Sequence, residues 1–127
     1  MNSTRIEKVE KVAARSRDLK LLLLFGSRAR EEAGESSDWD LGYIGGGQFD
    51  AAALLAELVY ALGCDRVDLV DLQRANGLLR FRAARDGIAL YETTPGTANE
   101  FRYAAASFWC DALPVLQRGY DDILAEV

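Results

Sequence analysis

The sequence predicts one α/β (α+β) domain in which a small mixed β-sheet is flanked by helices. Its length of 127 residues fits a single domain. Apolar residues make up 50% of the chain and occur in short blocks, which favours one packed core over disorder. Segments with helical periodicity alternate with short strand-like segments, and no linker separates them. Residues 1–127 are therefore expected to fold as one unit.

The first helix is expected over residues 4–16, where Thr4 and Glu7 have the spacing of a capping box and apolar residues follow at helical intervals. Residues 19–25 (LKLLLLF) form a short, nearly all apolar run that is typical of a buried strand, and a glycine ends it. The next segment, residues 27–33, is expected to form a helical turn or two.

Residues 38–44 (DWDLGYI) alternate as a strand does and run into three consecutive glycines. A helix is expected over residues 51–62, because Asp50 is a good N-cap and Gly63 stands where a C-terminal glycine belongs. The leucines of this helix fall on one face, which is expected to pack against the sheet.

The second half continues the alternation. Residues 66–72 (RVDLVDL) predict a third strand, residues 73–86 a helix and residues 88–91 a short strand. Inward-facing side chains of this helix are expected to be Leu78, Leu79 and either Arg82 or Ala83.

The tail, from about residue 97 to 126, is helical in pattern and rich in aromatic residues, with Pro114 kinking or splitting the helix. The simpler interpretation is a helix that covers the sheet. The alternative is a partner-binding face, because exposed aromatic residues often anchor interfaces.

Composition excludes several kinds of chemistry. The chain has no histidine and two cysteines, Cys64 and Cys110, which do not form a Cys-x-x-Cys pair. A His/Cys metal site and a histidine-based triad are therefore ruled out, and the cysteines are expected to be small, partly buried residues. Any acid–base or metal chemistry must come from carboxylates, lysines, tyrosines or serines.

Net charge and hydropathy indicate which partners and which cellular location are expected for the chain. The net charge is −5 and the pI about 4.7, whereas nucleic-acid binders usually have a basic excess, so direct nucleic-acid binding is not expected. The longest apolar stretch, residues 21–25, is far shorter than the roughly 20 residues needed to cross a bilayer. The charged N-terminus shows no signal peptide, so a cytoplasmic location is expected.

Gly26 and Ser27 directly follow a predicted buried strand and open a helical segment. Glycine lets the backbone approach a ligand, free N–H groups at a helix start point toward anions, and the serine hydroxyl can add a donor. Most Gly-Ser pairs are ordinary turns, but this one lies where the chain can bind phosphate.

Three aspartates are candidates for binding a metal. Asp38 and Asp40 point to one side of a predicted strand, and two carboxylates so close favour a cation between them, above all Mg²⁺. Asp68 lies inside an apolar strand, while nearby Asp71 falls on the opposite face. The alternative is that these residues decorate strand ends or turn to water.

A phosphate loop with such carboxylates provides the parts for metal-assisted phosphoryl-type transfer. One ion can activate the attacking oxygen, and another can bind a triphosphate and stabilise the leaving pyrophosphate. Arg28 and Arg30 can neutralise phosphate charge, but two residues apart on a helix they do not share a face. One of them is therefore expected to reach the nucleotide, and the other to be solvated or paired with a nearby glutamate.

The same residues resemble the signature of the DNA polymerase β-like nucleotidyltransferase superfamily. The segment GSRAR at residues 26–30 is followed by DWDL at residues 38–41, with ten residues between Ser27 and Asp38. Later segments (VDLVDL, LLRF and GIALYE) extend the likeness, which covers about residues 19–92. Within the superfamily the chain is most similar to minimal nucleotidyltransferases of the MntA antitoxin type, which work beside HEPN-domain toxins.

The resemblance implies a nucleotidyltransferase fold and particular roles. Asp38, Asp40 and Asp68 would be the catalytic, Mg²⁺-binding carboxylates, with Asp68 also assisting deprotonation of the acceptor hydroxyl. Gly26 and Ser27 would bind the triphosphate of ATP. The antitoxin type transfers AMP from ATP to a tyrosine of its cognate HEPN ribonuclease toxin and so neutralises it.

Length bears on the acceptor. Larger transferases of this superfamily carry a second domain that holds the acceptor, and this chain leaves no room for one, so the acceptor is expected on another chain or on a second subunit of a homo-oligomer. Two alternatives are a transferase acting on a small molecule or an RNA end, and a non-catalytic antitoxin that acts by binding alone. Glu31 departs from the family pattern, in which many relatives carry glycine.

Overall fold

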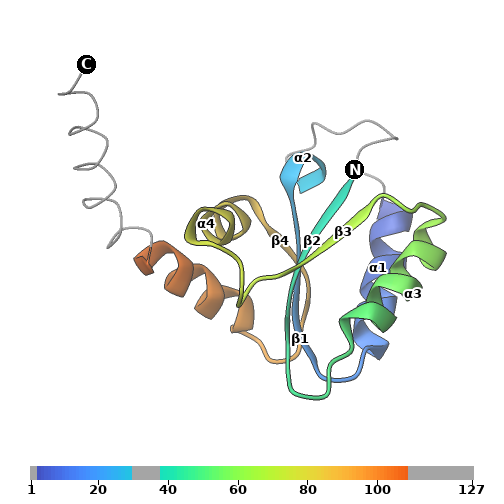
Figure 1. Ribbon diagram of the computed structural model, residues 1–127, viewed down its shortest axis with the longest axis horizontal. Coiled ribbons are helices and arrows are strands. Elements are labelled where there is room, and N and C mark those ends of the chain that lie inside the picture. The colour runs from blue at the N-terminus through green and yellow to red at the C-terminus, as the bar shows by residue number, and fades with distance from the viewer. Residues whose placement is uncertain (1–2, 30–37, 109–127) are drawn as a thin grey trace.

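The computed structural model describes residues 3–29 and 38–108, and in this part of the chain four strands form one sheet flanked by helices (Figure 1). The strands are β1 (Leu19–Phe25), β2 (Trp39–Gly45), β3 (Val67–Asp71) and β4 (Ile88–Glu92). The helices are α1 (Ser3–Arg15), α2 (Gly26–Ala29), α3 (Ala51–Leu62) and α4 (Gly77–Asp86), and residues 97–108 are also helical. The predicted mixed sheet is confirmed. None of these helices is long and apolar enough to span a membrane.

The strands are arranged in the order β3-β2-β1-β4. β1 pairs antiparallel with β2 and with β4, whereas β2 and β3 are parallel. A parallel pair requires a crossover connection, and α3 provides it. The registers place Phe25 opposite Asp40 and Asp40 opposite Asp68. Two acidic residues from separate parts of the sequence therefore lie side by side on adjacent strands.

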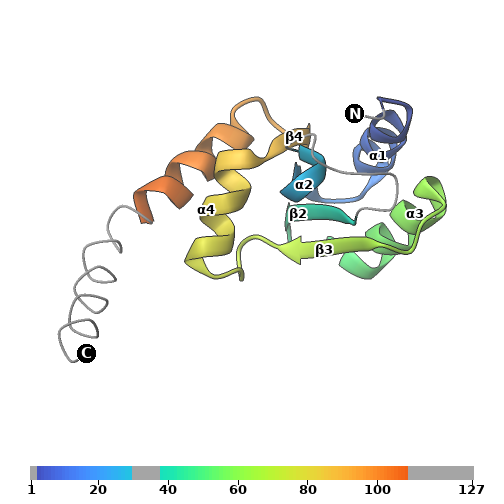
Figure 2. The same cartoon turned by 90° about the horizontal axis from the view of Figure 1, so that it is seen from above.

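Helices cover both faces of the sheet, with α1 and α3 on one side and α4 with the helix at residues 97–108 on the other (Figure 2). Side chains of β1 alternate between the two cores. Leu22 and Leu24 pack with α1 and α3, while Leu21, Leu23 and Phe25 pack with α4 and the helix after it. All five are buried. A strand buried on both faces reads as a continuous apolar run, which explains the LLLLF sequence.

α4 begins later than the expected residue 73, because turn chemistry precedes it. The Asp71 carboxylate accepts a hydrogen bond from the Gln73 N–H at 2.9 Å, and the Asn76 side chain caps the helix by accepting from the Leu79 N–H at 2.8 Å. In the helix that begins at Gly77, Ala83 is buried against the sheet, whereas Leu78 is 42% exposed. The expectation that Leu78 faces inward is therefore wrong.

Three smaller expectations can also be compared with the structure. α1 already includes Ser3, so Thr4 lies inside the first turn and is not the N-cap.

Cys64 is a partly buried free cysteine, as expected, and Cys110 lies outside the described residues. In the tail, Phe101 packs against the sheet, which confirms the covering helix for residues 97–108; Pro114 lies outside the described part.

We expect Asp50→Ala to lower the free energy of unfolding by about 1 kcal/mol. The Asp50 carboxylate accepts a hydrogen bond from the Ala53 N–H at 3.1 Å at the start of α3, and alanine leaves that N–H without its cap. Urea unfolding would measure the loss. Asp50→Asn keeps an accepting oxygen and is the matched control, and equal losses in the two variants would contradict a capping role.

Candidate active site

Asp40 and Asp68 lie opposite each other on adjacent strands at one end of the sheet, where β1 ends and β2 and β3 begin. Trp39 is buried among the residues that α1 and α3 cover. Because neighbouring residues of a strand point to opposite faces, Asp40 points to the face that α4 covers. Asp40 is half-buried and Asp68 is exposed, so both charges can reach a ligand at the surface.

A cavity of about 450 Å³ lies where this end of the sheet meets α4. β1, the start of α2, β2 and β3 contribute to its walls, and three residues of α4 complete it. The lining residues are Phe25, Gly26, Asp40, Asp68, Val70, Leu79, Arg82 and Asp86. The cavity therefore combines an apolar wall, three carboxylates and one guanidinium.

Gly26 brings the backbone directly against the Asp40 side chain. Its φ of +74° lies in the left-handed region of backbone conformation, which residues other than glycine adopt at a cost in free energy. A Cβ atom at this position would overlap the Asp40 Oδ2 atom and lie 3.1 Å from its Cγ. Both the turn and the close approach therefore require glycine. Gly26 follows β1 directly and is the first residue of the segment for which the sequence predicts phosphate binding.

The structure brings together two of the three predicted aspartates. Asp38 precedes β2, is exposed and does not line the cavity. Among the described residues, no group of three or more acidic, histidine or cysteine side chains is gathered closely enough to bind a metal. Two carboxylates still fit Mg²⁺, which proteins often bind through one or two carboxylates together with substrate phosphates. Asp40 and Asp68 are the residues that would hold it.

Arg28 lies away from the cavity. Its guanidinium is 4.3 Å from the centroid of the Trp39 ring, on the side of β2 opposite to Asp40. Burial, followed by the neighbouring charge of Arg5, lowers the pKa of Arg28 below its ordinary value. Arg28 therefore does not line the carboxylate cavity, although the sequence made it a candidate for nucleotide binding.

Ser27 and Arg30 are the two remaining candidates for nucleotide binding. Ser27 belongs to α2, directly after Gly26. Arg30 and Glu31 lie outside the described residues.

Sequence reasoning missed the contribution of α4. Leu79, Arg82 and Asp86 share one helical face, because they are spaced by three and four residues. That face lines the cavity. The spacing was visible in the sequence, but nothing local indicated that this helix face meets the ends of β2 and β3.

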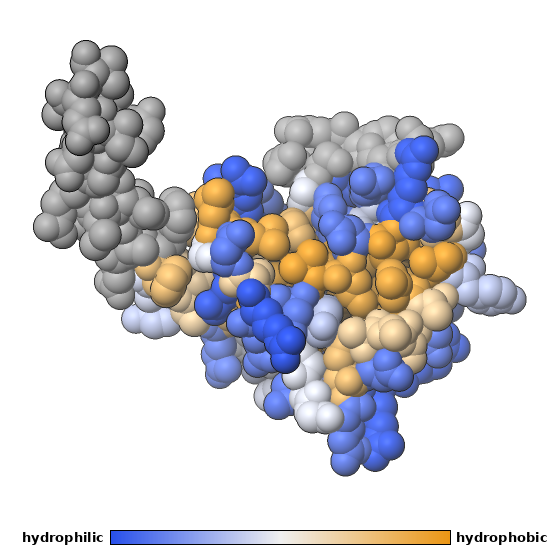
Figure 3. Space-filling model, in the orientation of Figure 1, coloured by the Kyte–Doolittle hydropathy of each residue, from blue (hydrophilic) through white to orange (hydrophobic). Residues whose placement is uncertain are grey.

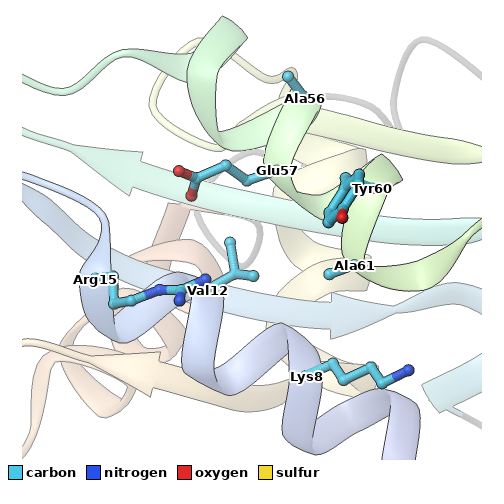
Figure 4. A pocket seen from close by; sticks show the side chains of 7 residues that line it. All are labelled: Lys8, Val12, Arg15, Ala56, Glu57, Tyr60 and Ala61. Carbon is cyan, nitrogen blue, oxygen red and sulfur yellow. The ribbon is translucent and has the colours of Figure 1, made fainter.

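A larger groove of about 700 Å³ lies between α1 and α3, on the other face of the sheet (Figure 4). It is lined by Lys8, Val12, Arg15, Ala56, Glu57, Tyr60 and Ala61. Glu57 is the single carboxylate among these residues, so the groove lacks the paired acids that metal-assisted transfer requires. The smaller cavity beside Asp40 and Asp68 is the better candidate for the active site.

The cavity has carboxylates on adjacent strands and a glycine backbone at one end of a mixed sheet, which is the arrangement expected for a nucleotidyltransferase. A model of the family described as "Polymerase beta, Nucleotidyltransferase" matches residues 7–95. The chain belongs to this nucleotidyltransferase family.

Among curated proteins, the chain is 31% identical over 96 residues to "Protein adenylyltransferase MntA" of Aphanizomenon flos-aquae (strain 2012/KM1/D3). The match covers 66% of this chain and 64% of the relative, so the chain spans somewhat less than two thirds of that protein.

Two solved structures resemble the chain over nearly its whole length. A toxin–antitoxin complex with AMP-PNP contains a chain 27% identical, with a TM-score of 0.75 and coverage of 98% of this chain and 99% of that one. A complex of a tri-AMPylated Shewanella oneidensis HEPN toxin with its MNT antitoxin contains a chain 26% identical, with a TM-score of 0.74 and the same coverage.

Proposed function

We propose that this protein is a Mg²⁺-dependent adenylyltransferase antitoxin, which transfers AMP from ATP to a tyrosine of a cognate HEPN ribonuclease toxin and so neutralises it. The observation that carries the proposal is the pairing of Asp40 with Asp68 beside the Gly26 backbone in one cavity. The likeness to an adenylyltransferase and to the partner of an AMPylated toxin supports this choice of donor and acceptor.

The reaction would proceed by attack of the tyrosine oxygen on the α-phosphorus of ATP. The new O–P bond forms as the bond between the α-phosphorus and the bridging oxygen breaks, and pyrophosphate leaves with that electron pair. Asp68, which is exposed at the start of β3, would accept the proton of the tyrosine hydroxyl. Bound magnesium would supply positive charge to the phosphate oxygens. Asp40 and the Gly26 backbone would fix the position of the phosphates against Asp68.

A protein acceptor is supported by the surface beside the cavity. Leu78 at the start of α4 is 42% exposed, and on the helix at residues 97–108 Tyr103 is 77% and Phe108 51% exposed. Phe108 lies against Gly77, the neighbour of Leu78, so Phe108 and Leu78 belong to adjoining parts of the surface. Figure 3 shows apolar residues, in orange, in a band across one face of the molecule. Exposed aromatic and aliphatic side chains of this kind are typical anchors of protein interfaces.

We expect the toxin, incubated with this protein, ATP and Mg²⁺, to gain mass in whole AMP units, as measured by intact mass spectrometry. A chelator added before ATP should prevent the gain, because phosphate charge would no longer be balanced. The control is the same mixture with Asp40→Asn. A tight complex without any mass gain in the wild-type mixture would contradict enzymatic transfer and indicate an antitoxin that acts by binding alone.

A further inference from the structure

The cavity beside Asp40 contains one positively charged side chain among the described residues, that of Arg82 on α4. A triphosphate is strongly anionic, and the neighbouring carboxylates would repel it unless cations balance the charge. Arg28, the cation predicted from the sequence, is stacked over Trp39 on the other side of β2. Arg82 is thus the described arginine that faces the place where the phosphates would lie.

The position of Arg82 is fixed while its side chain remains available. Ala83 and Ala84, the next two residues of α4, are buried against the sheet, which fixes the backbone of the helix. The Arg82 side chain is exposed. No hydrogen bond or ion pair to another described residue engages it. The guanidinium can therefore turn toward a ligand without breaking a structural contact.

The acidic neighbour of Arg82 in the cavity is already paired with a different arginine. The Arg85 Nε and Nη2 atoms donate hydrogen bonds to the two Asp86 carboxylate oxygens at 2.9 and 3.0 Å. This contact raises the pKa of Arg85 above its ordinary value, mainly through the hydrogen bond itself. Because Arg85 balances the Asp86 charge, the guanidinium of Arg82 remains free to pair with an anionic ligand.

We propose that Arg82 binds the β- and γ-phosphates of ATP and stabilises the pyrophosphate as it leaves. The planar guanidinium donates paired N–H groups that match two phosphate oxygens, whereas a lysine supplies a single point charge. This inference rests on the proposed nucleotidyl transfer and adds to it a cation from α4, outside the Gly-Ser and Asp-x-Asp segments. Arg82 is thereby a nucleotide-contacting residue that no local pattern marks.

The test measures binding of a non-hydrolysable ATP analogue and of AMP, each with Mg²⁺, to the full chain by calorimetry. We expect Arg82→Gln to weaken binding of the analogue by about ten-fold to one hundred-fold, because a charge-assisted pair is lost. AMP lacks the β- and γ-phosphates, so its affinity should not change. Arg82→Lys should fall between the wild type and Arg82→Gln. Arg74→Gln is the matched control, because Arg74 is an exposed arginine that lies 3.8 Å from Asp71 and does not line the cavity, and this variant should bind both nucleotides as the wild type does.

Several outcomes would overturn the assignment of Arg82. These are an unchanged affinity of Arg82→Gln for the analogue, an equal loss for AMP, and an equal loss in Arg74→Gln. Thermal unfolding of each variant shows whether the domain is intact, and the exposed position of Arg82 predicts that it is. The result is separate from the toxin-modification assay. A wild-type protein that binds the analogue through Arg82 but adds no AMP to the toxin would contradict the proposed function and leave this inference standing.

Discussion

Replacing Asp40 by asparagine is expected to lower the rate of AMP transfer at least about a thousand-fold while the domain stays folded. Asp40 lies between Phe25 of β1 and Asp68 of β3 in the sheet, so its carboxylate stands where three strands contribute to the cavity. Asparagine has nearly the same shape as aspartate but no charge. A cation in the cavity would therefore lose a charged ligand, and the phosphates that this cation binds would be held less firmly. Stability should be kept, because the substitution removes one of two neighbouring like charges.

Asp71→Asn is the matched control for Asp40→Asn. Asp71 also lies on β3 but does not line the cavity, and its carboxylate accepts from the Gln73 N–H and lies 3.8 Å from Arg74. Asparagine keeps an accepting oxygen there, so transfer should be unchanged. Rates would be measured by following the toxin mass over time, with circular dichroism to confirm folding. Unchanged transfer in the double variant Asp38→Asn with Asp40→Asn would contradict the catalytic assignment.

Much of the fold was predictable because local signals and tertiary packing agree. β1 and α3 begin and end at the expected residues. The all-apolar run of β1 matches burial on both faces, and the capping residues Asp50 and Gly63 mark the ends of α3. α4 is the exception, since the helical periodicity extends back to residue 73. Hydrogen bonds at Asp71 and Asn76 form a turn there and delay the helix.

The site was predictable only in part, because its assembly depends on strand pairing and helix placement. The likeness to a known family indicated Asp40 and Asp68, but their places opposite each other arise from the parallel pairing of β2 and β3, which the spacing in the sequence does not encode. The position of Arg28 over Trp39 depends on how α2 packs beside β2. Arg82 enters the cavity because α4 packs over the ends of the strands. Each of these contacts joins distant segments, so no local pattern could reveal it.

We expect Gly26→Ala to lower the rate of transfer at least about a hundred-fold, because a displacement of about 1 Å in a reacting group can have such an effect. The added Cβ would overlap the Asp40 carboxylate, which is the end of a side chain and can rotate away. The fold can therefore survive, but the carboxylate would leave its place beside Asp68. The left-handed φ of +74° adds a cost of about 1–2 kcal/mol to the free energy of unfolding.

Gly63→Ala separates the two effects, because Gly63 has a similar φ of +62° at the end of α3 and its Cβ would meet nothing within 4 Å. Urea unfolding should show similar losses of stability for both variants, whereas transfer by the folded protein should fall only in Gly26→Ala. If Gly26→Ala kept full activity per folded molecule, the contact between the Gly26 backbone and Asp40 would have no part in catalysis. A loss confined to Gly26→Ala would mean that this glycine is required for the position of a carboxylate, beyond its role in the turn.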